Sequence, residues 1–197
     1  YSVNWLKNNN MTTPPDINPY EFILNKINWR YEKGIPNIQE STVLHGDSTE
    51  ILPKILERCK KNNVKFSLLF TSPPYCSITD YHADQWLRLW LLGGDASPKT
   101  PKIKYKGRFN NKQEYYELLD TVFGFCSGLM DEHSTIYVRT DKREYTLNST
   151  VEILKKHFPM HEMQIHQKPL KDDTRTQTKL FGDKSLKPGE VDIILRN

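Results

Sequence analysis

The chain has 197 residues, of which 37% are hydrophobic and 26% are charged, and its formal net charge is +4. This length is sufficient for one domain with a full hydrophobic core. No apolar run approaches the roughly 18 residues of a membrane-spanning helix, and no charged-then-apolar signal pattern opens the chain, so the sequence indicates no membrane partner. The small positive charge permits nucleic-acid binding without requiring it, because a local basic patch matters more than the total.

The cysteines and histidines give no indication of a metal or disulfide framework. Cys59, Cys76 and Cys126 are widely spaced and odd in number. This usage fits the reducing environment of a cytoplasm. The six histidines show no spacing typical of metal ligands, so the sequence predicts no metal site.

The first elements predict a strand–helix–strand unit. Near the amino terminus, Asn18 and Pro19 are typical of an N-cap and first helical position, and the helix would extend to about Ile27. Residues 41–45 are then predicted to form a strand, and residues 49–61 a helix, with Pro53 tolerated in its first turns. The two flank a Gly-Asp-Ser turn and lead into the apolar strand at 66–70, which makes one βαβ unit.

The apolar run at 66–70 ends in Thr71-Ser72-Pro73-Pro74-Tyr75. The run predicts a buried parallel strand that delivers a loop at its carboxyl end, where open α/β sheets bind ligands. Proline has no N–H and keeps its predecessor out of the helical region, so the loop is stiff and offers acceptors but few donors. Such a loop suits a substrate that brings hydrogens, for example an exocyclic amino group, and Tyr75 adds a flat face for stacking.

These residues resemble the catalytic motif Asp/Asn/Ser-Pro-Pro-Tyr/Phe of the DNA amino-methyltransferases. Residues 80–91 also look like the segment that follows this motif in bacterial DNA modification methylases. The resemblance covers about residues 41–197, which would form the catalytic domain. It implies an α/β fold with a Rossmann-like methyltransferase sheet, mostly parallel with a closing antiparallel hairpin and with helices on both faces. It further implies S-adenosylmethionine as methyl donor, double-stranded DNA as partner, a bacterial-type cytoplasmic location and a role in restriction-modification.

The resemblance assigns the loop its roles. The amino nitrogen of a base must become tetrahedral and positively charged, and acceptors aimed at its hydrogens favour that change. Ser72, by its hydroxyl or carbonyl, and the Pro73 carbonyl would be these acceptors, with Pro74 keeping the loop rigid and Tyr75 stacking on the base. Because the base is hidden in duplex DNA, it must be flipped out, at a cost of a few kcal/mol.

The resemblance also implies a cofactor site. The family places an acidic residue at the end of a strand to accept a hydrogen bond from the adenine amino group of the cofactor, and Asp47 matches that position. Ser48 and Thr71 are predicted to complete the site. Capping of the following helix by Asp47 or Ser48 is the simpler alternative, and a cap by Ser48 is compatible with the cofactor role.

Ser-Pro-Pro-Tyr is similar to enzymes that act on cytosine N4, whereas Asp-Pro-Pro-Tyr favours adenine N6. Cytosine N4 is therefore the predicted target and adenine N6 the alternative. Methylation at cytosine carbon 5 is rejected, because it needs a thiolate directly after the proline and Tyr75 separates Pro74 from Cys76. A non-catalytic DNA-binding module with a methyltransferase-like fold stays open as a different class of function.

No two of the nine glycines are separated by a single residue. A Gly-x-Gly loop normally holds S-adenosylmethionine in the family that the motif resembles. We therefore expect a truncated, split or incomplete methyltransferase, in which a companion chain or a missing segment supplies the Gly-rich loop. Residues 1–40 would be an amino-terminal extension or a remnant of the cofactor-binding half.

A helix over residues 82–92 is predicted next, with an apolar stripe assigned to the core and an end at Gly93-Gly94. Tyr81, at its start, is predicted to face the substrate. The loop at 95–112 is basic and long, which favours contact with DNA phosphates, although a solvated charged loop is an open alternative. Its predicted DNA contacts are Lys102, Lys104, Lys106 and Arg108.

The remaining pattern predicts a helix at 111–130, a strand at 134–139, a helix at 145–158 and two closing strands at 161–167 and 190–196. The inward face of the helix at 111–130 is predicted to contain Tyr115, Leu118, Leu119, Val122, Phe125, Cys126 and Leu129.

Overall fold

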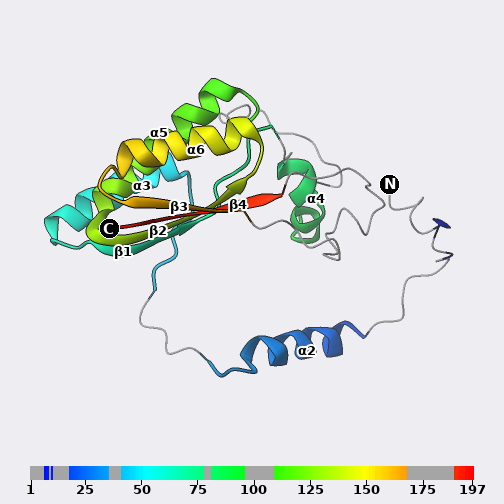
Figure 1. Ribbon diagram of the computed structural model, residues 1–197. Helices are drawn as coiled ribbons and strands as arrows, with labels where there is room; N and C mark the ends of the chain where they lie inside the picture. The colour runs from blue at the N-terminus through cyan, green and yellow to red at the C-terminus, as the bar shows by residue number, and fades with distance from the viewer. Residues whose placement is uncertain are drawn as a thin grey trace. The chain divides into compact units, whose positions relative to one another are not determined.

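A four-stranded mixed sheet forms the centre of the computed structural model (Figure 1). Its strands are β1 (Phe66–Thr71), β2 (Met130–Asp141), β3 (Glu162–Gln167) and β4 (Glu190–Arg196), in the order β1-β2-β4-β3. The structure describes residues 7, 8, 10, 18–35, 41–77, 81–95, 109–167 and 189–197, with side chains in the segment 81–95 only from residue 86 onward.

The chain divides into two units. The first comprises Tyr1–His45 with Asp173–Leu186, and the second comprises Gly46–Asp172 with Lys187–Asn197. In the first unit the structure describes helix α2 (Pro19–Tyr31), whose N-cap Asn18 accepts a hydrogen bond from the Tyr20 amide at 3.0 Å. The predicted cap and the Pro19 start are confirmed. The second unit contains the sheet.

Strand pairing confirms the α/β class and the closing hairpin. β1 runs parallel to β2, with Leu69 opposite Ile136, while β2–β4 and β4–β3 are antiparallel. Among the described strands the sheet has one parallel and two antiparallel pairs, so it is mixed rather than mostly parallel as predicted. In β2 and β4, alternate residues such as Ile136, Val138 and Ile193 are fully buried, as a period of two requires for one covered face.

Three helices form the covering layer on that face: α3 (Ser48–Lys61), α5 (Lys112–Leu129) and α6 (Glu144–His157). α6 packs on β2, α5 packs on α6, and α3 packs on α5 (Figure 1). The α5 residues Tyr115, Leu119 and Phe123 recur every four positions and are buried against the sheet. Phe125, predicted to face inward, is only half-buried, and Phe123 takes the core position instead.

Two predictions about β1 and its surroundings are wrong in part. Residues 41–45 form no strand, and Val43 is 91% exposed, because no described strand pairs with this segment. β1 forms at the predicted place and is parallel to β2, but among the described strands it lies at the edge of the sheet and is not buried. Its side chains Phe66, Leu68 and Phe70 are exposed on the face opposite the helical layer, so no helix covers them in the part of the chain that the structure describes.

The helix after the motif forms as predicted, as α4 (Tyr81–Leu91), but its apolar stripe is not core. Leu87, Trp90 and Leu91 are exposed. The apolar periodicity correctly indicated a helix with one apolar face, which by itself does not require a packing partner. Gly93, at φ +92°, ends the helix as predicted, since its amide bonds the Trp90 carbonyl at 2.9 Å.

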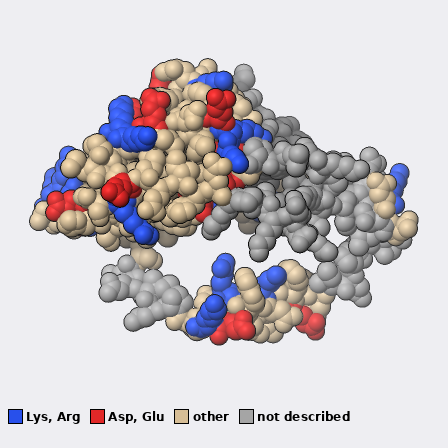
Figure 2. All heavy atoms as spheres, viewed as in Figure 1, with Lys and Arg blue, Asp and Glu red and all other residues tan. Residues whose placement is uncertain are grey.

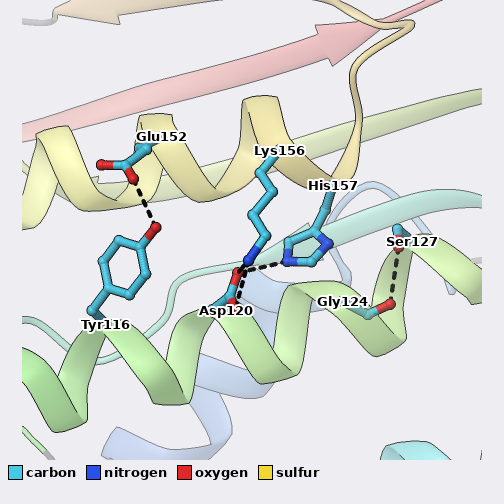
Figure 3. Close-up of polar contacts among 7 residues, drawn as sticks. All are labelled: Tyr116, Asp120, Gly124, Ser127, Glu152, Lys156 and His157. Atoms are coloured by element: carbon cyan, nitrogen blue, oxygen red, sulfur yellow. Dashed lines mark hydrogen bonds and ion pairs between the residues drawn. The ribbon is translucent and has the colours of Figure 1, made fainter.

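Polar contacts join α5 to α6 beside the core (Figure 3). Asp120 on α5 accepts hydrogen bonds at 2.8 Å from Lys156 Nζ and lies 2.8 Å from His157 Nε2, both on α6. Gly124 gives the His157 ring its space, because a Cβ there would lie 3.1 Å from the ring carbon Cε1. The hydrogen bond from Lys156 is the main cause that lowers the pKa of Asp120 below its ordinary value of 3.8.

We expect Asp120→Asn to weaken the pH dependence of the free energy of unfolding in acidic solution. A carboxyl group whose pKa is lower in the folded state stabilises the fold above its unfolded pKa and loses this contribution as the pH falls through the folded pKa. The variant should therefore be less stable than the parent above about pH 4 and converge with it in more acidic solution. Urea unfolding at a series of pH values measures this difference, and a constant difference down to pH 2 would contradict it.

Of the helices that the structure describes, none combines the length and apolar character required to cross a membrane.

Candidate functional site

The carboxyl end of β1 opens onto a cavity of about 360 Å³. The parallel pairing of β1 with β2 ends at Thr71 opposite Val138, and the Ser72–Tyr75 loop leaves the sheet at this edge. The described residues that line the cavity are Asp47, Ser48, Thr71, Ser72, Pro73, Pro74, Phe109, Leu118, Leu119 and Val122. The structure thus brings the predicted cofactor residues and most of the predicted catalytic loop to one cavity.

Asp47 stands at this cavity as the N-cap of α3. Its Oδ1 accepts hydrogen bonds from the Thr49 amide at 2.8 Å and from the Thr49 hydroxyl at 2.6 Å. Aspartate is a preferred N-cap residue because, in an extended conformation, its side-chain oxygen accepts a backbone amide hydrogen of the first turn, so the local sequence fixes this position. Capping is performed by Asp47 rather than Ser48, which is the first residue of the helix.

The apolar wall of the cavity was not predicted. It comes from α5, through Leu118, Leu119 and Val122, and from Phe109 just before that helix. The sequence assigned the α5 residues to the core, which is correct for Leu119, yet their outer edges also face the loop. The loop is fastened to this wall, because the Ser77 amide donates to the Phe109 carbonyl at 2.6 Å.

Tyr75 belongs to a second group of polar residues beside the cavity, and it is not among the described residues that line it. Its hydroxyl donates to Glu190 Oε1 at 2.8 Å. Burial and the Glu190 carboxylate raise the pKa of Tyr75 to about 12, so the phenol is protonated at neutral pH. Stacking of Tyr75 on a base remains a prediction.

An ion pair between two strands of the sheet lies next to this polar group. Arg139 on β2 binds Asp192 on β4 through two hydrogen bonds, Nε to Oδ1 at 2.7 Å and Nη2 to Oδ2 at 3.1 Å. The buried Asp192 carboxylate raises the pKa of Arg139 above its ordinary value. Arg139 Nε also lies 3.8 Å from Glu190 Oε2. The sequence predicts only strand positions for Arg139, Glu190 and Asp192. The predicted closing hairpin is the one signal for their proximity, because antiparallel pairing places the start of β4 beside the end of β2.

Cys76 follows the motif as a buried residue of the hydrophobic core. Within the described ranges, no group of three or more histidine, cysteine, aspartate and glutamate side chains could hold a metal ion.

The predicted DNA contacts lie outside the described residues. These are Lys102, Lys104, Lys106 and Arg108, and the side chain of Tyr81, whose backbone opens α4. On the face drawn in Figure 2, the described basic and acidic side chains are interspersed rather than gathered into one basic patch. Phosphate contact by the 95–112 loop therefore stays a prediction.

Comparison with known proteins gives little beyond this geometry. No protein-family model matches the chain, and no curated protein matches it. The structure resembles that of SMU.776, a proposed methyltransferase complexed with SAH, with a TM-score of 0.41 and 11% sequence identity. The match covers 88% of this chain and 36% of that one, so the chain spans about a third of the length of this neighbour.

Proposed function

We propose that the chain is the catalytic part of an S-adenosylmethionine-dependent methyltransferase that acts on the exocyclic amino group of a DNA base. The observation that carries this proposal is the shared cavity. Asp47 and the Ser72-Pro73-Pro74 loop are distant in sequence and belong to different elements, yet they line the same space. If they lay on opposite sides of the sheet, one bound cofactor could not reach both Asp47 and the loop.

The loop supplies the chemistry that amino methylation needs from a protein. An amino nitrogen conjugated with the ring of the base is a poor nucleophile, and it becomes more reactive as it turns tetrahedral. Carbonyl and hydroxyl oxygens of Ser72 and Pro73 can accept the hydrogens of that nitrogen and stabilise its developing positive charge without reorganising. The two prolines keep these acceptors in place because their backbone torsions are restricted.

The cavity residues fit a cofactor that has an adenine ring. The apolar wall of Phe109, Leu118 and Val122 suits a flat ring, and the carboxylate of Asp47, which lines the same cavity, suits its amino group. S-adenosylmethionine, when bound, supplies an activated methyl group on a sulfonium centre. The residues of this chain would hold the cofactor on one side and orient the amino group of the substrate on the other.

Cytosine N4 is the proposed target, with adenine N6 as the alternative, and double-stranded DNA is the proposed partner, from which the base is flipped out. Incubation of the full chain with S-adenosylmethionine and DNA, followed by mass identification of the nucleosides, tests the proposal. N4-methylcytosine is expected. N6-methyladenine would correct the base, and DNA binding without any methylated nucleoside would favour a non-catalytic module.

Asp47→Ser separates the two roles of this residue. Serine is as good an N-cap as aspartate, so α3 should keep its stability within about 0.5 kcal/mol. The variant lacks the carboxylate, however, and a lost charge-assisted hydrogen bond should weaken S-adenosylmethionine binding by roughly 10-fold or more. Calorimetric titration measures the affinity and urea unfolding measures the stability. Unchanged affinity would show that Asp47 is a cap alone.

We further propose that another polypeptide segment completes the site with a Gly-rich loop. Support comes from β1, which is an edge strand among the described elements and exposes Phe66, Leu68 and Phe70. The backbone edge of such a strand can pair with a further strand, and the apolar face that these side chains form could be covered by a further helix. If the chain binds S-adenosylmethionine by itself with micromolar affinity, no such segment is required.

A further inference from the structure

We propose that one side of helix α2 binds the phosphate backbone of DNA. The residues of this basic face are Phe22, Lys26, Trp29 and Arg30, with Lys33 just after the C-cap of the helix. The inference rests on DNA as the partner in the proposed function. It adds a DNA contact in the first unit, whereas the cavity lies in the second.

The spacing of the residues gathers the cations on one side of α2. Lys26 and Arg30 are four residues apart, so they are neighbours on the helix surface. Phe22 comes four residues before Lys26 and Trp29 comes three residues after it, so both rings lie beside the cations. All four side chains are exposed. The basic face is therefore a stripe in which aromatic and cationic side chains alternate.

The acidic residues of α2 lie away from this basic face. Glu21 is five residues before Lys26, and the C-cap Glu32 is six residues after it. At about 100° per residue, these two carboxylates are about 140° and 120° from Lys26 around the helix axis. Neither is three or four residues from Lys26 or Arg30, which are the spacings at which ion pairs form within a helix. The charge of the basic face is therefore not cancelled by the helix that carries it.

Two aromatic rings hold the cations in place. Lys26 Nζ lies 5.6 Å from the ring centroid of Phe22 and 5.8 Å from that of Trp29. Arg30 Cζ lies 6.0 Å from the Trp29 centroid. These are the distances of cation–π contacts. The rings themselves are 52% exposed in Phe22 and 67% exposed in Trp29. A ring restricts a cation without cancelling its charge, which leaves N–H groups that can donate to an anion.

This combination fits the backbone of DNA. Lys and Arg along one helix are a typical electrostatic signature of a nucleic-acid-binding surface, and a guanidinium group matches the oxygens of a phosphate. A membrane of anionic lipid fits less well. In a helix that lies on a membrane the aromatic side chains enter the lipid, whereas here Lys26 and Arg30 lie over the ring faces and would have to leave water with them.

The first experiment measures binding of the full chain to a fluorescein-labelled DNA duplex by fluorescence anisotropy, at a series of salt concentrations. Lys26→Gln/Arg30→Gln/Lys33→Gln should weaken binding at least about 10-fold at roughly 50 mM salt, because three phosphate contacts are lost. The slope of log K against log salt should become shallower by about 2 to 3, since each contact contributes roughly 0.9. The loss should be the same for two duplexes of unrelated sequence, because phosphates carry no sequence information. Circular dichroism checks that the helix is kept.

The last turn of α3 provides a matched control. It contains three exposed cations, Arg58, Lys60 and Lys61, and lies at the opposite end of α3 from Asp47. Arg58→Gln/Lys60→Gln/Lys61→Gln removes the same charge and should change the affinity by no more than about twofold, because salt screens distant charges. Equal losses in the two triple variants would show that only net charge matters and would overturn the proposal. An unchanged affinity in the α2 variant would overturn it too.

Phe22→Leu/Trp29→Leu tests the rings separately. Leucine keeps an apolar side chain in a helix, and all three cations remain, but the ring faces that hold them are lost. Binding to the duplex should weaken roughly 2- to 5-fold, with a nearly unchanged salt slope. An unchanged affinity would overturn the role of the rings.

Vesicles and the methylation assay separate this inference from its alternatives. Vesicles that contain phosphatidylserine should not distinguish the parent from the α2 triple variant. Vesicle binding that depends on the three cations, with unaffected duplex binding, would assign the basic face to a membrane and overturn the proposal. If the parent methylates no nucleic acid but binds DNA through α2, the proposed function fails and this inference stands. If the chain methylates DNA and the triple variant has an unchanged KM for DNA, the proposed function stands and this inference fails.

Discussion

Replacing Ser72 by alanine is expected to lower the rate of methyl transfer roughly 100- to 1,000-fold, the usual effect of removing one preorganised polar group from a charged transition state. Ser72 lines the cavity and stands directly before the two prolines of the loop. Alanine keeps the backbone carbonyls of the loop but removes the hydroxyl acceptor. The loss should therefore appear in kcat, measured with saturating S-adenosylmethionine and DNA, and not in DNA affinity.

Ser127→Ala provides the matched control. The Ser127 hydroxyl, on α5, donates to the Gly124 carbonyl at 2.9 Å and lies outside the described lining of the cavity (Figure 3). This variant should keep the parent rate. A Ser72→Ala protein that also keeps the parent rate would assign the acceptor role to the backbone carbonyls of Ser72 and Pro73 alone.

The local part of this site could be predicted from the sequence. An apolar run that ends in Ser72-Pro73-Pro74 forces a strand followed by a stiff loop, because the prolines cannot continue the ladder. The Gly46-Asp47 turn stands directly before a predicted helix, and aspartate is a preferred N-cap residue, so this cap could also be predicted. Both features depend on a few neighbouring residues, and the structure shows both.

Contacts between distant elements could not be predicted in the same way. The apolar stripe of α4 and the apolar run of β1 predict burial but do not indicate which element would cover them, and Leu91 and Phe70 are exposed. From the sequence, Glu190 is predicted only as a strand residue; its place beside the end of β2 follows from the register of β4 against β2. The apolar wall of the cavity could not be predicted for a related reason, because residues such as Leu118 and Val122 can pack in a core and line a cavity at the same time.

The sharpest test of the packing is the pair Phe123→Ala and Phe125→Ala in α5. Phe123 is 1% exposed within the core between the helical layer and the sheet, so its loss should lower the free energy of unfolding by about 3–5 kcal/mol. Phe125 is half-buried, and truncating it should cost only about 1 kcal/mol. Urea unfolding followed by circular dichroism, with an unchanged slope, measures both values.

The two phenylalanines also distinguish the orientation of α5 predicted from the sequence from the orientation in the structure. The apolar pattern of α5 places Phe125 on the inward stripe, whereas the structure buries Phe123, four residues after Leu119 and eight after Tyr115. A larger loss for Phe125→Ala would mean that α5 is rotated about its axis. Because Leu118, Leu119 and Val122 form the apolar wall of the cavity, such a rotation would also move that wall away from the Ser72-Pro73-Pro74 loop. The ratio of the two decreases in the free energy of unfolding therefore tests the position of the cavity wall without any ligand or assay of activity.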